Sequence, residues 1–499
     1  MAPFDPDTYR SRAEQCTGEL EAEYYRHFAG LKDECDLTSV YARYADLFSK
    51  EAVDTLTDLY RVADGDEKRR FSYLLNFAID GFMGEQSKEL GDEIANLEGR
   101  ATIRVDGEEI GYRHSSVVLS NESDRQRRRR IDEARREVVR RQLNPRYDEL
   151  WRLLHGLAGE LGQPHYCELY ADVRAVDFGM LRAAGDSFLH DTEGVYQRML
   201  DRLVQRTMGF GLDELHYADF PYLIRASEYD HVFSSERLLP TFERLLADMG
   251  IDLAAQTNVH VDAEARDNKS PRAFCAPVRV PDEIYLVIMP HGGQDDLQAL
   301  LHEGGHTEHL SHTPRELAFE YRHLGDNAVT EAFAFLFDHL MLNPVWLETY
   351  LDFSDSADFL VFANVVELYF LRRYAGKLAY ETELHVANGP LDAFAGRYSR
   401  LLSQAVLVEV PPDTYLADVD AGFYCSCYLR AWMLEAALRL LLQDTYGVDW
   451  FRNTEAGQHL KRMWAHGQQY SADQLLLKHG GGKLDMGPLK RHLERALGR

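Results

Sequence analysis

The sequence predicts a mainly α fold with one small β-sheet and one tight hairpin. Apolar residues at three-to-four spacing, with charged residues between them, run through most of the chain. Two shorter regions alternate apolar and polar residues instead. The hydrophobic fraction of 45% and the charged fraction of 27% are typical of a folded protein. Because single cores stop growing at roughly 250 to 300 residues, a chain of 499 residues is expected to form two or three structural units.

The first half of the chain is expected to be helical, apart from one hairpin. The clearest helical patterns cover residues 13–31, 51–63, 69–99 and 144–162. Residues 101–113 instead form two short alternating runs around Asp106-Gly107, a pair that favours a two-residue turn.

A small sheet is expected directly before a histidine-rich helix. Residues 258–265, 272–280 and 283–290 have strand patterns, and turn-forming residues separate them. From residue 292 onward the pattern is helical again. Periodicity alone therefore divides the chain into an N-terminal helical region, residues 1–190, and a second region, residues 191–499.

The charge of the chain excludes some classes of partner. The formal net charge is −27, from 82 acidic and 55 basic residues, and a field of this sign repels nucleic acids and anionic membranes. No signal peptide and no run of about 18 apolar residues is found. The six cysteines are too scattered for a disulfide framework. We expect a cytoplasmic protein whose partners include neither nucleic acid nor membrane.

Two local features have competing interpretations. The Cys425 and Cys427 pair suits a soft metal, but small core residues are the simpler interpretation. The arginine-rich segment 125–142 has acidic residues at helical spacing and no aromatic residue to stack on a base. This segment favours an ion-paired helix face, and a site for RNA or another polyanion is the alternative.

The stretch HEGGH contains the main candidate site. His302 and His306 are four residues apart, so on a helix their rings lie on one face and can bind one ion together. Glu303 is adjacent to the first histidine, where its carboxylate can reach a water on the ion but not readily the ion itself. In this HExxH arrangement, two imidazoles hold zinc and the glutamate accepts a proton from water.

Catalytic zinc usually has three protein ligands, and three downstream residues are candidates for the third. Glu331 is favoured, because a carboxylate among Ala, Phe and Leu residues is costly to bury without a cation opposite it. His312 and Asp326 are the alternatives, while His309, His323 and His339 are interpreted as structural. Gly304 and Gly305 are expected where bulk would obstruct the metal or a neighbouring helix.

These residues resemble the zinc peptidase family of thimet oligopeptidase and oligoendopeptidase F. HEGGH with Glu331 following 25 residues after His306 is similar to that family's pattern, as are AFC in the sheet region and Asp296. The resemblance implies a two-lobed helical metallopeptidase with a deep cleft and the small sheet beside the zinc helix. It also implies that residues 191–499 form the catalytic region, that one zinc ion is the cofactor and that short peptides are the substrates.

The resemblance also implies roles for individual residues. His302, His306 and Glu331 would hold zinc, Glu303 would be the general base, and Tyr424 and Tyr428 would stabilise the oxyanion. Asp296 is expected either to cap the helix or to hold a zinc ligand from behind. The sequence departs from the family pattern at three positions: Asp418, Asp420 and Ser426 stand where a histidine and two tyrosines are expected.

Two other functions remain open at this point. A zinc carboxypeptidase of the related helical type shares HExxH and a later glutamate, and would release single C-terminal residues. A zinc-holding peptide-binding protein without turnover would fit the departures at Asp418, Asp420 and Ser426, although Glu303 argues against it. The sequence predicts neither the peptide length nor the oligomeric state.

Overall fold

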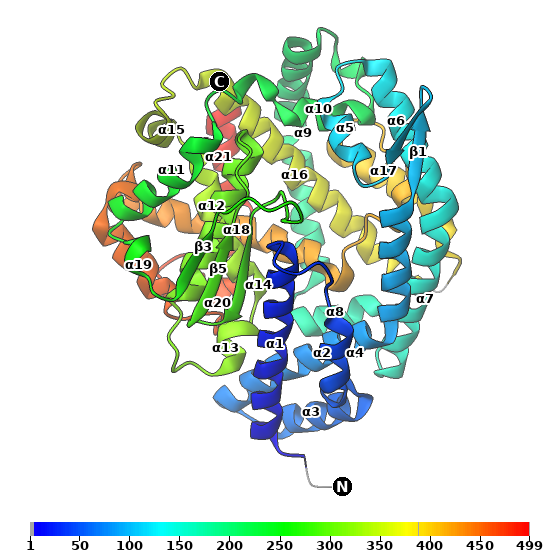
Figure 1. The fold of residues 1–499 in the computed structure, drawn as a ribbon, viewed down its shortest axis with the longest axis vertical. Coiled ribbons are helices and arrows are strands. Elements are labelled where there is room, and N and C mark those ends of the chain that lie inside the picture. Colours follow the sequence, from blue (N-terminus) through cyan, green and yellow to red (C-terminus); the bar gives the residue numbers. More distant parts are fainter. Residues whose placement is uncertain (1–3, 388, 499) are drawn as a thin grey trace. The chain divides into compact units, whose positions relative to one another are not determined.

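The computed structural model describes residues 4–387 and 389–498, and it confirms the mainly α fold (Figure 1). The chain divides into two compact units, and each is made from three segments. Unit 1 consists of residues 1–82, 227–360 and 430–489. Unit 2 consists of residues 83–226, 361–429 and 490–499.

The predicted boundary between residues 190 and 191 does not separate these units. It falls inside helix α9 (Phe178–Met208) of unit 2, and the units change within α4 (Gly65–Arg100), α16 (Ala357–Leu384), α18 (Tyr424–Tyr446) and α21 (Gly487–Leu497). Because helical periodicity continues through these points, a pattern read along the sequence gives no sign of them.

Helices make up most of each unit, and the helices predicted in the first half are confirmed. Those wholly within unit 1 are α1 (Pro6–Phe28), α2 (Leu37–Arg43), α3 (Lys50–Val62), α11 (Ser235–Asp248), α12 (Gln294–Ser311), α13 (Phe319–His323), α14 (Asn327–Asp338), α15 (Pro344–Leu351), α19 (Thr454–Trp464) and α20 (Ala472–Lys478). Those wholly within unit 2 are α5 (Ser115–Asn121), α6 (Arg125–Val138), α7 (Asn144–Glu160), α8 (Tyr166–Arg174), α9, α10 (Phe220–Arg225) and α17 (Ala395–Val406).

The predicted three-stranded sheet lies in unit 1. It contains β3 (Val259–Asp262), β4 (Phe274–Arg279) and β5 (Glu283–Val287) in the order β3-β5-β4, with β3 parallel and β4 antiparallel to β5. Helix α12 packs against β4 and β5, and α1 packs against β4 (Figure 1). The prediction that a small sheet lies beside the histidine helix is therefore confirmed, and β4 is an edge strand.

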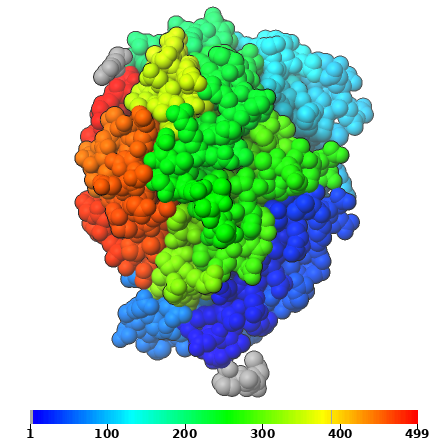
Figure 2. All heavy atoms as spheres, turned by 60° about the vertical axis from the view of Figure 1, so that its left-hand side comes forward, coloured from blue at the N-terminus to red at the C-terminus, as the bar shows by residue number. Residues whose placement is uncertain are grey.

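The N-terminal segment of unit 1 is fixed by a buried carboxylate. Glu320 of α13 is fully buried and accepts hydrogen bonds from Nε of Arg10, at 2.7 Å, and Nε of Arg70, at 3.1 Å. Figure 2 shows the blue N-terminal residues against green and yellow-green residues from the middle of the chain. One charged side chain thus connects α1 and α4 to the region between the two site helices, α12 and α14.

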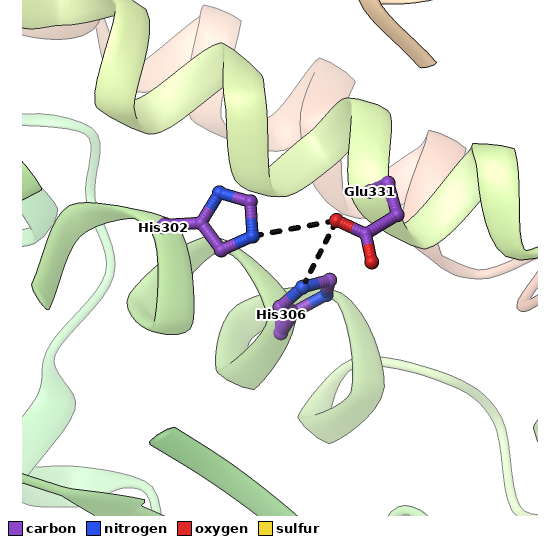
Figure 3. A group of neighbouring side chains, drawn as sticks. All are labelled: His302, His306 and Glu331. Atoms are coloured by element: carbon purple, nitrogen blue, oxygen red, sulfur yellow. Dashed lines mark ion pairs between the residues drawn. The ribbon is translucent and has the colours of Figure 1, made fainter. Parts of the chain in front are cut away.

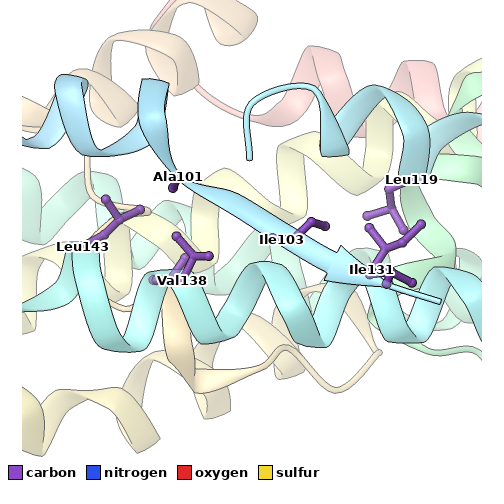
Figure 4. Close-up of a cluster of buried hydrophobic side chains, with 8 residues drawn as sticks. Ala101, Ile103, Leu119, Ile131, Val138 and Leu143 are labelled. Atoms are coloured by element: carbon purple, nitrogen blue, oxygen red, sulfur yellow. The ribbon is translucent and has the colours of Figure 1, made fainter. Parts of the chain in front are cut away.

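The predicted hairpin lies in unit 2. Strands β1 (Thr102–Val105) and β2 (Glu108–Gly111) pair antiparallel, and both turn residues have positive φ, 54° at Asp106 and 85° at Gly107. Asp and Gly tolerate this conformation well, which is why the pair predicts such a turn. Apolar residues of β1, α5, α6 and the π-helical segment Val139–Leu143 form one buried cluster (Figure 4).

Most arginines of α6 are ion-paired, as the charge pattern predicts. Within unit 2, Arg128 is almost fully buried and bonds to the fully buried Asp219 at 2.7 Å. Arg136 binds both Asp132, at 2.9 Å, and Asp413, at 3.1 Å. The guanidinium groups are thus used in internal pairs, and this confirms the interpretation of an ion-paired helix face.

Two further observations concern the whole described chain. Within residues 4–387 and 389–498, no helix combines the length and the apolar character needed to cross a membrane. All six cysteines are free thiols, and Cys425 and Cys427 are buried, in agreement with their interpretation as core residues.

Candidate metal centre

Helix α12 holds the HEGGH stretch in the core of unit 1. It begins after Gly293, and Asp295 and Asp296 lie in its first turn, where acidic side chains stabilise a helix N-terminus. Leu297, Leu300 and Leu301 are fully buried and fix the face that the helix turns toward the core. His302 and His306 follow on the same helix, one turn apart.

The two glycines allow neighbouring helices to approach α12. A Cβ at Gly304 would lie 2.4 Å from the ring of Phe242 in α11. A Cβ at Gly305 would lie 2.6 Å from Cα of Ala334 and 2.7 Å from the carbonyl oxygen of Phe333, both in α14. The expectation that bulk would obstruct a neighbouring helix is confirmed, and at Gly305 the neighbour is the helix that supplies Glu331.

Three side chains converge between α12 and α14 (Figure 3). Nε2 of His302 lies 3.3 Å and Nε2 of His306 lies 3.7 Å from Oε2 of Glu331. Each residue offers one ligand atom to a group whose atoms all lie within 4.8 Å of one another. The residues predicted as metal ligands are therefore brought together.

The opposite nitrogen of each ring is held by α14. Nδ1 of His302 lies 3.0 Å from Oδ2 of Asp338, and Nδ1 of His306 lies 2.8 Å from Oγ1 of Thr330. Such contacts fix the ring orientation and tautomer so that Nε2 faces the ligand position. Neither Asp338 nor Thr330 was predicted from the sequence, although Asp338 follows Glu331 by two helical turns and thus lies on the same face of α14.

The donor set fits a zinc ion. Zinc bonds of about 2.0 to 2.2 Å in a tetrahedral site place neighbouring ligand atoms about 3.4 Å apart, close to the two separations observed. Two imidazole nitrogens and one carboxylate are a common catalytic set that leaves a fourth position open. Burial disfavours the charged form of His302, but the hydrogen bonds to Asp338 and Glu331 outweigh this and raise its pKa to about 10. Asp338 and Glu331 therefore favour a positive charge at His302, whereas burial lowers the pKa of His306.

Glu303 lies apart from the three ligand atoms, at the edge of the sheet. Its Oε2 accepts a hydrogen bond of 2.9 Å from the backbone N–H of Cys275 in β4. That N–H consequently points away from β5, along the free edge of the strand. The carboxylate is thus held between the histidine helix and an edge strand.

The alternative third ligands have other partners. Nδ1 of His312 lies 2.9 Å from the carbonyl oxygen of Glu308, at the C-terminal end of α12. Asp326 caps α14 by accepting from N–H of Ala328, and both of its oxygens bond to Arg430, at 2.9 and 2.7 Å. The contact of His312 thus lies at the end of α12, and the contacts of Asp326 fix the start of α14. Asp326 therefore positions the helix that carries Glu331 and does not join the group of three residues.

Asp296 closes a loop rather than orienting a ligand. Its Oδ2 accepts hydrogen bonds from the backbone N–H groups of His291, at 2.7 Å, and Gly292, at 2.9 Å. Of the two expected roles, support at the helix start fits these contacts better, since Asp338 and Thr330 make the contacts to the histidine rings.

Tyr424 and Tyr428 belong to unit 2, so their predicted role at the centre stays a prediction. Their rings are 5.2 Å apart, and Tyr428 also packs on Tyr374 at 5.3 Å. The three residues that depart from the family pattern also lie in unit 2, and each has a partner within that unit. Asp418 binds Arg373 at 2.6 Å, and Asp420 binds Lys377 at 2.6 Å. Buried Ser426 donates to the carbonyl oxygen of Phe423.

Comparison of the sequence with protein-family models gave no match, and a search of curated proteins gave no significant match.

Proposed function

We propose that this protein is a zinc-dependent peptidase that hydrolyses bonds within short peptides. The observation that carries the proposal is the convergence of Nε2 of His302, Nε2 of His306 and Oε2 of Glu331, with Glu303 adjacent on the same helix. A structural zinc site usually has four protein ligands, whereas three ligands with an additional carboxylate beside the open position are typical of hydrolysis.

His302, His306 and Glu331 would hold the ion, and Asp338 and Thr330 would keep the imidazole rings aligned. When bound, zinc polarises a carbonyl and makes a coordinated water easier to deprotonate at neutral pH. Glu303 accepts the proton from water and then donates it to the leaving amine. The N–H of Cys275 holds the Glu303 carboxylate at the strand edge, where a substrate carbonyl is expected to lie.

Strand β4 offers a backbone surface for an extended peptide. Among the residues that the structure describes, its outer edge is not paired with another strand. Because the N–H of Cys275 is bonded to Glu303 and Pro277 has no N–H, a substrate that adds as a further strand would pair with the carbonyl oxygens of this edge. Pairing of this kind depends little on side chains, which suits a peptidase that acts on many sequences. The proposal that the substrates are short peptides comes from the family resemblance. It would require a deep cleft that excludes folded proteins, which the same resemblance implies.

Chelator-sensitive cleavage of short peptides tests the proposal. A mixed peptide library is digested with zinc-loaded protein, with and without chelator, and the products are identified by mass spectrometry. Internal fragments support an oligopeptidase. Release of single C-terminal residues supports the related carboxypeptidase. If the protein retains zinc and cleaves no peptide, the result supports a peptide-binding protein without turnover. The Glu303→Gln variant is the control, because it keeps the ligands and removes the base.

The cytoplasm is the compartment that we propose for this activity. Free thiols at all six cysteines fit a reducing environment, and short peptides are abundant substrates there.

A further inference from the structure

An exposed aromatic patch lies beside the edge strand of the candidate centre. Tyr24 and Phe28 near the end of α1 are 38% and 43% exposed, and their rings stack at 6.0 Å with an interplanar angle of 13°. Phe28 also meets Phe274 of β4 edge to face, at 6.3 Å. We call Tyr24, Phe28 and Phe274 the aromatic patch. Single exposed apolar residues need no explanation, but a contiguous group next to a site is typical of a binding surface.

The patch is continuous with the catalytic carboxylate along the backbone. Phe274 immediately precedes Cys275, whose N–H donates to Glu303. Successive side chains of a strand point to opposite faces, so Phe274 and Ala276 share one face and Cys275 lies on the other. Ala276 is paired with Tyr285, which stacks on Tyr25 of α1 at 3.7 Å. The Phe274 face of β4 is therefore the face that α1 covers.

The backbone at the end of α1 is fixed to the loop before β4. N–H of Ser270 donates to the carbonyl oxygen of Phe28 at 2.7 Å, and Nε of Arg266 donates to the carbonyl oxygen of Ala29 at 2.6 Å. Gly30 has a φ of 71°, and a Cβ there would lie 2.8 Å from the backbone nitrogen of Lys269. The exposed rings of the patch thus stand on a preorganised backbone, which lowers the entropic cost of binding a ligand.

We propose that the aromatic patch is a specificity subsite for a large apolar side chain of the substrate. The inference rests on the proposed peptidase function. An extended peptide along the free edge of β4 lies about 4.8 Å from that strand, and its side chains alternate between the two faces. A residue beside the scissile bond whose side chain points to the α1 face meets Phe28 and Tyr24. A charged side chain at this position would lose hydration against the rings of Phe28 and Tyr24.

Peptides that differ at one position test the subsite. A set of short quenched-fluorescent peptides carries Phe, Leu, Ala or Glu at each position flanking the cleaved bond. At one of these positions, wild-type protein is expected to cleave the Phe and Leu peptides with kcat/KM at least about tenfold above that for Ala, as an apolar pocket typically achieves. The Tyr24→Ala/Phe28→Ala variant is expected to reduce this ratio below about threefold. Phe4→Ala, at the opposite end of α1 and 37% exposed, is the matched control and should keep the wild-type ratio.

A binding measurement separates failure of the subsite from failure of the proposed function. Zinc-loaded Glu303→Gln protein, with and without the Tyr24→Ala/Phe28→Ala changes, is titrated with labelled Phe and Ala peptides. Tighter binding of the Phe peptide that the double change abolishes supports the subsite, even if wild type hydrolyses nothing. Equal kcat/KM for all peptides, or a preference that survives the double change, overturns the subsite and leaves hydrolysis intact.

Discussion

At the scale of single residues, the geometry of the candidate centre depends on two side chains that contact the histidine rings. Asp338 and Thr330 lie behind the two histidines and hold their Nδ1 atoms at 3.0 and 2.8 Å. Both come from α14, which also supplies Glu331. One helix therefore supplies Glu331 and orients both histidines, so small changes in α14 are expected to change metal affinity.

Replacement of Asp338 by Asn is expected to weaken zinc binding by about 10- to 100-fold, because the ring of His302 loses its charged partner. Competition with a chromogenic chelator measures the affinity. Asp444→Asn, which changes the same charge on the exposed surface of α18, is the control. An unchanged affinity in the Asp338→Asn variant would show that the contact to His302 has no part in metal binding.

A buried carboxylate in unit 2 makes stability depend on pH. Glu381 is fully buried, and burial raises its pKa to about 8 from an ordinary value of 4.5. Its partners are the N–H of Asp420, at 2.9 Å, the thiol of Cys425, at 3.2 Å, and Lys377, at 3.9 Å. Between these pH values the folded state holds a proton that the unfolded state has lost, so the free energy of unfolding falls as pH rises from about 4.5 to 8.

The Glu381→Gln variant is therefore expected to lose less stability than wild type between pH 5 and pH 8. Urea unfolding at a series of pH values gives the two slopes. Parallel slopes for the two proteins would mean that Glu381 ionises in the folded state as readily as in the unfolded chain.

At the scale of elements, the close contact of α12 with α14 depends on Gly305. Gly305→Ala is expected to destabilise the protein by about 1 to 3 kcal/mol, since the added methyl group overlaps the backbone at Ala334. Gly156→Ala is the control: Gly156 also lies within a helix, the space that a Cβ would take there is open, and alanine is the better helix former. Thermal unfolding measures the stability of both variants against wild type. Equal melting temperatures for Gly305→Ala and wild type would contradict the close packing of α12 against α14.

At the scale of the whole molecule, the sequence predicted local elements well and their long-range grouping poorly. Periodicity identified the helices, and Asp106-Gly107 identified the hairpin turn, because these signals are local. HExxH predicted that His302 and His306 lie together on one helix, and the cost of burying Glu331 predicted that it lies opposite them, as the structure shows. Two or three units were expected, but not which segments form each unit, because each unites segments that are distant in the sequence. Asp338 and Thr330 were missed because the spacing of Asp338 from Glu331 indicates a shared helix face but not which side chains of that face contact the histidine rings.

The zinc content of purified protein tests the central claim most directly. Wild type, Glu303→Gln and Glu331→Gln are loaded with zinc, dialysed against metal-free buffer and analysed for bound metal. We expect about one tightly bound zinc in wild type and in Glu303→Gln, a large loss of zinc in Glu331→Gln, and peptide hydrolysis by wild type alone. Equal zinc retention by wild type and Glu331→Gln, or equal hydrolysis by wild type and Glu303→Gln, would contradict the account.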